Sequence, residues 1–204
     1  IYRYAPVSGD LRSHLCDRTE MYWRYLRLYC QTNVTPIAKR NVNILPADVS
    51  AEAVRLLAWA PALRGRAHHK CHPVSEPYSI WADCRERLGY PVRRMEPQAW
   101  FDFLTSRPDD FYDDNARMLL AFFGKDGRDP IKGVQFDMTN TLRLLKKTGL
   151  TIPRFSFELF AKYYEVLVRE GWLPAPDGRQ AKAPLPPITP ASPVTDNKGA
   201  KAHA

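Results

Sequence analysis

The chain has 204 residues, of which 45% are hydrophobic and 12% aromatic, and its formal net charge is +8. This length suits one ordinary domain or the larger part of a two-lobed one, and the apolar content excludes global disorder. No apolar run approaches the ~20 residues of a membrane-spanning helix. The positive charge favours acidic partners, such as phosphates or an acidic protein, and does not by itself indicate nucleic acid.

Periodicity and capping residues predict a mostly helical chain of α/β type with a few short strands. Strands are expected at 1–7, 42–45, 66–72, 90–95 and 134–136. Helices are expected from Asp17, with Glu20 completing a capping box, and then at 48–60, 78–88, 97–104, 118–123, 139–148 and 156–170. Gly9 is expected to form a turn because glycine tolerates positive φ. Pro97 suits the first turn of a helix, and Ser156 is expected to cap the last one.

The two ends of the chain and its cysteines give further expectations. The first residue, Ile1, is not Met, and no signal peptide follows it, which predicts a fragment or a processed product. Seven of the last 31 residues are proline, so 174–204 is expected to be a disordered tail or linker. The four cysteines form no close pair, which favours reduced thiols and a cytoplasmic location.

The motifs of several enzyme classes are absent. No G-x-G-x-x-G follows a predicted strand, no Walker A motif occurs, no tyrosine precedes a lysine by four residues, and no G-x-S-x-G is present. The usual dinucleotide cradle is therefore missing, and no residue of this chain is predicted to be catalytic.

One cluster has metal-ligand chemistry. It consists of His68, His69, Cys71 and His72. On a strand these side chains alternate between two faces, and two ligands on each face do not close a tetrahedral site. Packed or exposed strand residues are the favoured interpretation, and no metal is predicted.

The helix expected from Asp17 has an aromatic face and a basic face. The aromatic face carries Met21, Tyr22, Tyr25, Leu26 and Tyr29. The nearby basic residues are Arg12, Arg18, Arg24 and Arg27. The aromatic face suits the wall of an apolar substrate tunnel or a core face, and the core face is the commoner of the two. The arginines suit phosphate contacts or a solvated surface, and the solvated surface is favoured.

Four stretches carry the motifs of one known family. They are Tyr2–Asp10, similar to Y-R-P-G-R-I-S-G-D; the aromatic helix Cys16–Gln31; Val42–Asp48, similar to V-D-x-x-P-V-D; and the series Phe136-Asp137-x-x-Asn140-Thr141, Thr148-Gly149, Pro153 and Gly171–Pro176. Over residues 1–176 the chain resembles the C-terminal half of the thioester reductase domains of nonribosomal peptide and polyketide synthases, which belong to the extended short-chain dehydrogenase/reductase family. It departs from that pattern at Tyr4-Ala5, where the family has Pro-Gly, at Asn43, where it has Asp, and at Cys71-His72-Pro73, where it has Val-Asn-Pro.

The resemblance implies an organisation and a reaction. Residues 1–60 would hold the last strands and helix of the nucleotide-binding half, 61–173 the substrate-binding lobe and 174–204 the tail. The rest of the nucleotide-binding half, with the catalytic set, would precede Ile1. In the family, NADPH reduces an acyl or peptidyl thioester, held on the phosphopantetheine arm of a carrier protein, to an aldehyde or an alcohol.

The resemblance also implies roles for particular residues. Those near the cofactor would be Tyr2, Arg3, Tyr4 and Ala5, those near the substrate Val7, Ser8, Gly9, Tyr22, Trp23 and Leu26, and those that dock the carrier Arg24 and Arg27. Two other interpretations stay open: a non-catalytic module that binds an acyl group or a carrier protein, and a degenerate remnant. The substrate lobe of a larger domain predicts an exposed apolar face on residues 1–7 and 41–60. The binding module predicts strands that are already paired within the chain.

Overall fold

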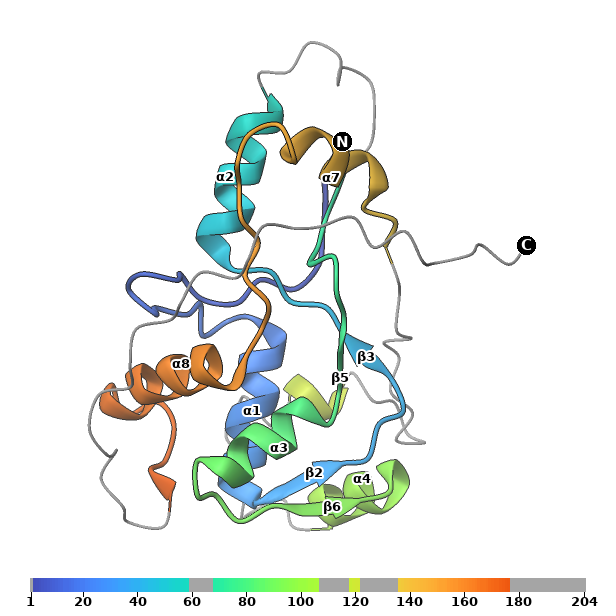
Figure 1. Ribbon diagram of the computed structural model, residues 1–204. Coiled ribbons are helices and arrows are strands. Elements are labelled where there is room, and N and C mark those ends of the chain that lie inside the picture. The colour runs from blue at the N-terminus through green and yellow to red at the C-terminus, as the bar shows by residue number, and fades with distance from the viewer. Residues whose placement is uncertain (1, 59–67, 107–117, 122–135, 177–204) are drawn as a thin grey trace.

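The computed structural model describes residues 2–58, 68–106, 118–121 and 136–176, and within them short strands alternate with helices (Figure 1). The strands are β1 (Tyr2–Tyr4), β2 (Val34–Pro36), β3 (Asn41–Val42), β4 (His68–Lys70), β5 (Glu76–Pro77) and β6 (Arg93–Met95). The helices are α1 (Met21–Thr32), α2 (Ala47–Ala58), α3 (Ile80–Arg87), α4 (Pro97–Thr105), α7 (Thr139–Leu145) and α8 (Phe157–Arg169). The predicted fold class, α/β with mostly helices and few short strands, is confirmed.

The described strands form three two-stranded ladders. β1 pairs in parallel with β4, β2 pairs in parallel with β6, and β3 pairs antiparallel with β5. A single parallel bridge between Val7 and Leu45 continues the line of β1. The strand expected at 1–7 is therefore shorter than predicted. β2 was not predicted, because its three residues follow directly on a helix.

Two groups of helices bury separate sets of side chains, and they lie at opposite ends of the view in Figure 1. The larger core joins α1, α3, α4 and α8, and its fully buried side chains include Trp23, Trp100, Tyr163 and Phe160. The smaller core joins α2 and α7 and includes Leu45, Val49, Leu57, Leu145 and Ile152. The expected boundary near residue 60 lies outside the described residues and stays a prediction, as does the tail beyond 176.

Helix ends follow the local signals in most places. Ser156 Oγ accepts a hydrogen bond from the Leu159 amide, 3.3 Å away, and Pro97 opens α4, as expected. Gly171 follows α8 with a φ of 68°, which suits a residue without Cβ. The capping box is wrong: α1 begins at Met21, and Asp17 Oδ1 instead accepts from the Thr19 amide and hydroxyl in a local turn.

Gly9 meets a different requirement from the one expected. Its φ is not among the positive values of the chain, but a Cβ there would lie 2.5 Å from the Leu15 carbonyl oxygen and 2.6 Å from Tyr163 Cε1. Glycine is needed because two other segments approach its backbone closely, not because the turn needs a left-handed residue.

The apolar face expected on residues 1–7 and 41–60 is not found in the parts of these segments that the structure describes. Among the side chains that the structure describes, the large apolar ones with high exposure are Leu15, Ile37 and Val74, which lie outside both segments. α7 and Ile152 cover the inner face of α2, and Ala5 packs against Cys71 and Met138. Each described strand is paired with another one of the chain, as the binding-module interpretation expects. No described helix is long and apolar enough to cross a membrane.

Candidate functional site

A cavity of about 250 Å³ lies beside α1, and the aromatic face of that helix forms one wall. Tyr22, Tyr25, Leu26 and Tyr29 all line it. Their spacing of three and four residues places them on one side of the helix. Tyr25, Leu26 and Tyr29 are also almost completely buried, so the stripe is both a core face and a cavity wall.

The facing walls come from segments distant in the sequence. Val42 and Ile44, in and after β3, lie on one side, and Tyr78 and Trp81, at the start of α3, lie on another. Ala5 and Pro6, which directly follow β1, also line the cavity, as does Phe136. Most of this surface is aromatic or aliphatic, so the cavity suits an apolar group.

A short polar contact interrupts the apolar wall. The hydroxyls of Tyr29 and Tyr78 lie 2.5 Å apart, and the guanidinium carbon of Arg40 lies 4.4 Å from the centre of the Tyr78 ring. Burial, followed by the neighbouring Tyr78 hydroxyl, raises the pKa of Tyr29 well above its ordinary value, so this hydroxyl stays protonated. Glu20 also lines the cavity, and burial raises the pKa of its carboxyl.

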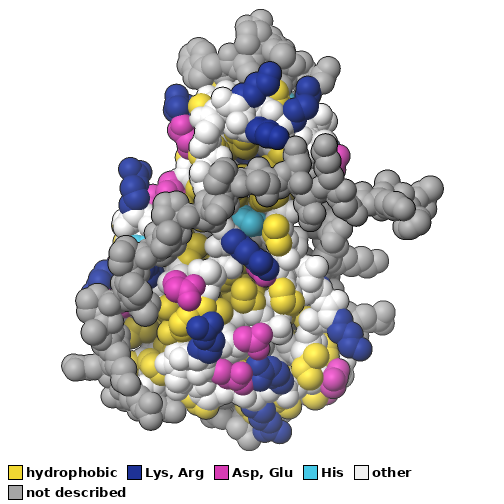
Figure 2. Space-filling model, viewed as in Figure 1, with side chains coloured by type: hydrophobic (Ala, Val, Ile, Leu, Met, Phe, Trp, Pro, Cys, Tyr) yellow, Lys and Arg dark blue, Asp and Glu magenta, His cyan; other side chains and the backbone are white. Residues whose placement is uncertain are grey.

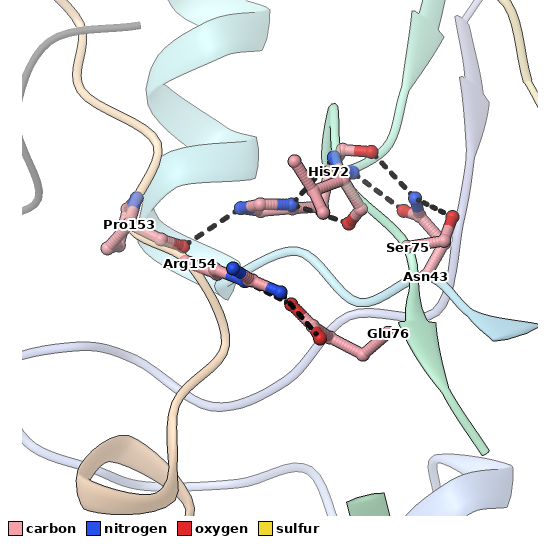
Figure 3. A network of polar contacts seen from close by, with 7 residues as sticks. Asn43, His72, Ser75, Glu76, Pro153 and Arg154 are labelled. Atoms are coloured by element: carbon pink, nitrogen blue, oxygen red, sulfur yellow. Dashed lines mark hydrogen bonds and ion pairs between the residues drawn. The ribbon is translucent and has the colours of Figure 1, made fainter.

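A polar network braces the β3 side of the cavity and ties three segments together (Figure 3). Asn43 donates from Nδ2 to the His72 carbonyl (2.6 Å) and to Ser75 Oγ (3.1 Å), and its Oδ1 accepts from the His72 amide (2.6 Å). Beside it, Arg154 donates to both carboxylate oxygens of Glu76, from Nε at 2.5 Å and from Nη2 at 3.1 Å. The loop after β4 is thus held from both β3 and the segment before α8.

His72 is the centre of this network. Its Nε2 lies 3.1 Å from the Pro153 carbonyl oxygen, and its Nδ1 lies 2.7 Å from the Val74 carbonyl oxygen and 3.0 Å from the Val74 amide nitrogen. Burial lowers the pKa of the imidazole below its ordinary value, and the contacts with the Val74 and Pro153 carbonyl oxygens act in the opposite direction. A neutral ring therefore links the loop after β4 to the segment before α8.

Replacing Asn43 by aspartate is expected to lower the free energy of unfolding by about 1–3 kcal/mol. The carboxylate keeps the acceptor for the His72 amide but puts a negative oxygen opposite the His72 carbonyl, where Nδ2 now donates. Urea unfolding of the two proteins measures the difference. The matched control is Asn41→Asp, two residues away on an exposed position, which is expected to change stability by less than about 0.5 kcal/mol. Equal losses of stability in the two variants would contradict a stabilising role for the Asn43 side chain in this network.

Only some of the residues predicted to lie near the cofactor and the substrate line the cavity. Ala5, Tyr22 and Leu26 line the cavity. Tyr2, Arg3 and Tyr4 form β1, where the side chain of Arg3 is exposed. Val7, Ser8, Gly9 and Trp23 are not part of the lining. Instead, Tyr163 of α8 donates to the Gly9 carbonyl (2.9 Å), and its hydroxyl lies 3.2 Å from Ser8 Oγ.

The two arginines expected to dock a carrier protein contact their own chain. Arg24 Nε donates to the Thr19 carbonyl at 3.0 Å, and Arg24 Nη1 lies 3.3 Å from Met118 Sδ. The guanidinium carbon of Arg27 lies 5.4 Å from the Trp172 ring. On the face shown in Figure 2, basic and acidic side chains are interspersed rather than separated into patches of one sign.

The histidine and cysteine cluster does not converge. His72 faces Pro153, whereas His69 Nδ1 lies 3.0 Å from the Asp137 carbonyl and its ring packs against Phe136. Within the described ranges, no three His, Cys, Asp or Glu side chains come together in a way that could hold a metal ion. All four cysteines are free.

Sequence reasoning missed several residues of the cavity. Arg40 and Tyr78 carry no sequence signal of a site. Phe136 begins one of the family motifs and Trp81 lies in the helix expected at 78–88, but neither is predicted to line a cavity. No local pattern marks them, because they meet the α1 face only after the chain has folded. Asn43 and His72 both depart from the family pattern, and those two departures are the usable pointers to the network.

Comparisons with known proteins place this geometry in context. No protein-family model matches the chain. It is 22% identical over 174 residues to one of the subunits of the linear gramicidin synthase of Brevibacillus parabrevis, covering 85% of this chain and 3% of that protein. It is 25% identical over 197 residues to isonitrile lipopeptide synthase of Streptomyces coeruleorubidus, covering 91% of this chain and 13% of that protein.

Solved structures of reductase domains also match most of this chain. The terminal R domain from the myxalamid PKS-NRPS biosynthetic pathway matches with a TM-score of 0.79 and 25% identity, over 87% of this chain and 45% of that one. The reductase (R) domain of a nonribosomal peptide synthetase from Mycobacterium tuberculosis matches with a TM-score of 0.68 and 17% identity, over 84% and 46%. An archaeal thiolation-reductase di-domain matches with a TM-score of 0.63 and 14% identity, over 84% and 36%.

The chain thus spans less than half the length of each of these reductase structures and a small fraction of the two synthases. The likeness extends over more than four-fifths of its own residues. It agrees with the resemblance carried by the sequence motifs at Tyr2–Asp10, Cys16–Gln31, Val42–Asp48 and 136–176. Over most of its length, the chain has the fold of part of a reductase (R) domain of nonribosomal peptide and polyketide synthases.

Proposed function

We propose that this chain is the substrate-binding portion of an NADPH-dependent thioester reductase, which releases a carrier-bound acyl or peptidyl thioester as an aldehyde or an alcohol in the cytoplasm. The observation that carries the proposal is the apolar cavity beside α1, in a chain whose fold matches reductase domains. Ala5 and Pro6 at its edge follow β1, where the family motif Y-R-P-G brings backbone close to the cofactor. An acyl group in the cavity would thus point toward the reaction centre.

The proposed contribution of this chain is to hold the acyl group of the substrate and to exclude water from it. Hydride transfer needs a carbonyl that is positioned and shielded from water. Tyr22, Leu26 and Trp81 surround the cavity with apolar surface, which favours an acyl chain over water. The Asn43 and His72 network ties the β3 side of the cavity to the loop after β4 and to the segment before α8 through partly buried polar contacts, which supports a preformed cavity wall.

The described residues do not fit NADPH on their own. A dinucleotide needs anion contacts from a glycine-rich turn at a helix N-terminus, and neither the sequence nor the lining of the cavity offers one. The cavity is also smaller than the roughly 300–1,000 Å³ that is usual for larger ligands. The nucleotide would therefore be held by residues outside this chain, and no chemical step is derived through it.

A carrier protein is the proposed macromolecular partner. One of the matched structures is a thiolation-reductase di-domain, which supports this choice. Arg24 and Arg27 remain the proposed contacts, with Arg27 placed over Trp172 and Arg24 over the start of α1. Reversing both charges is the direct test of their role, and unchanged carrier association would contradict it.

A chimaera tests the proposed function. The segment of the myxalamid terminal R domain that matches this chain is replaced by this chain, and NADPH consumption with an acyl-pantetheine thioester is followed together with aldehyde formation. The chimaera is expected to reduce the thioester, whereas this chain alone is expected not to quench or enhance NADPH fluorescence saturably. A folded chimaera that binds NADPH and the thioester without reducing it would support the binding module instead. Saturable NADPH binding by this chain alone would contradict the proposed division of roles.

A further inference from the structure

We infer that the cavity takes a compact, ring-bearing acyl group, such as an aryl or arylalkyl carboxylic acid presented as its thioester, rather than a long linear fatty acyl chain. This rests on the proposed function and names the substrate class of the same site. Three properties of the cavity carry it: its size, the residues of its walls and the polar contact within them.

Size sets an upper limit on the group that enters. The cavity measures about 250 Å³. An apolar cavity of about 150 Å³ is already large enough to hold benzene. One aromatic ring with a short methylene or amide extension therefore fills this space, whereas a long alkyl chain would leave much of its length outside, in contact with water.

The walls favour a ring over other compact groups. Six of the lining side chains are aromatic: Tyr22, Tyr25, Tyr29, Tyr78, Trp81 and Phe136. Aromatic pairs in offset or edge-to-face contact gain free energy beyond that of area burial alone. The centres of the Tyr22 and Trp81 rings lie 5.6 Å apart, and the two rings are stacked with an interplanar angle of 19°. A further ring in the cavity could pack against this stacked pair.

The polar contact fixes one side of the cavity. The Tyr29 and Tyr78 hydroxyls are bonded to each other across α1 and the start of α3, and Arg40 packs over the Tyr78 ring. Together they cross-link two walls of the cavity. A buried hydroxyl pair held by a cation–π contact resists being displaced by an extending alkyl chain, because the two hydroxyls would lose their hydrogen bond in an apolar environment.

Binding of two pantetheine thioesters to the full 204-residue chain tests the inference. Phenylacetyl-pantetheine and dodecanoyl-pantetheine are compared by calorimetry, with quenching of tryptophan fluorescence as a second readout, since Trp81 lines the cavity. The phenylacetyl thioester is expected to bind about tenfold more tightly or better, equivalent to about 1.4 kcal/mol. Equal or tighter binding of the dodecanoyl thioester would overturn the inference, and this comparison needs no variant.

A matched pair of variants locates the binding. Val42→Trp puts a large ring at a half-buried position of the cavity wall and is expected to weaken phenylacetyl binding about tenfold. Val74→Trp makes the same change at an exposed valine outside the lining and is expected to leave binding unchanged. Far-ultraviolet circular dichroism verifies that both variants are folded. Equal affinities for the two variants would overturn the assignment to this cavity.

The outcomes separate this inference from the proposed function. If the chimaera reduces dodecanoyl and phenylacetyl thioesters equally well and the chain binds both equally, the substrate class is wrong and the proposed function stands. If the chain prefers the phenylacetyl thioester but the chimaera reduces neither, the proposed function fails and the ligand preference stands.

Discussion

Gly9→Ala is expected to destabilise the chain by about 3 kcal/mol, because the added methyl group has nowhere to go. Its Cβ would lie 2.5 Å from the Leu15 carbonyl oxygen, 2.6 Å from Tyr163 Cε1 and 2.9 Å from Cys16 Sγ. A backbone oxygen and a buried ring cannot both move aside without cost. Relieving the overlap would also stretch the 2.9 Å hydrogen bond from the Tyr163 hydroxyl to the Gly9 carbonyl.

Urea unfolding of the wild type and the variant measures this effect. Gly149→Ala is the matched control: it has a φ of 73°, but nothing lies within 4 Å of its added Cβ. The control is expected to lose only about 1 kcal/mol, from backbone strain alone. A loss at Gly9 no larger than the loss at Gly149 would mean that the 9–16 loop moves away from α8 easily, and that Gly9 does not anchor it.

Local signals in the sequence predicted the helices better than the reasons for the turns. The Ser156 cap and Pro97 in the first turn of α4 depend on residues within a few positions, and both are confirmed. The role of Gly9 depends on Tyr163, which lies far along the chain, so composition alone suggested the wrong reason. The capping box failed because Asp17 bonds to Thr19, an equally local competitor.

Only one wall of the cavity, the aromatic face of α1, could be predicted from the sequence. Helical spacing identified the Tyr22, Leu26 and Tyr29 face of α1 correctly. Whether that face packs solidly or borders a cavity depends on the side chains that meet it. Tyr78 and Val42 reach it through ladder pairing between β3 and β5, which no periodicity of such two-residue strands can signal.

The polar network beside the cavity also could not be predicted from local sequence patterns. Asn43, His72 and Pro153 come from three separated segments, and their contacts are mostly between a side chain and a backbone group. Sequence motifs marked two of these positions as departures from the family, Asn43 for Asp and His72 for Asn. In the structure, the Asn43 side chain forms hydrogen bonds with both backbone groups of His72, whereas the His72 ring contacts Val74 and Pro153.

The second large effect is expected at Arg85, whose replacement by alanine should cost about 3–5 kcal/mol of stability. Its side chain is completely buried; Nη1 donates to Thr35 Oγ1 at 2.7 Å and Nη2 to the Tyr29 carbonyl at 2.5 Å. That carbonyl belongs to the last turn of α1, which contains no basic residue of its own. Arg85 thus supplies from α3 the positive charge that the C-terminal end of α1 lacks.

Thermal or urea unfolding of Arg85→Ala should be compared with that of Arg94→Ala. Arg94 makes more ion pairs, with Asp83 at 2.8 Å and Glu86 at 2.5 Å, but on the surface. Surface pairs contribute about 0–1 kcal/mol, so the control is expected to lose far less. Arg85→Lys keeps the charge but cannot make both hydrogen bonds in the same geometry, and we expect an intermediate loss. If Arg94→Ala cost as much as Arg85→Ala, the surface ion pairs between β6 and α3 would stabilise the chain as much as the buried link between α3 and α1 does. A loss of stability confined to Arg85→Ala would instead indicate that the buried link between α3 and α1 supports the cavity wall. Tyr29 accepts the hydrogen bond from Arg85 and also lines the cavity.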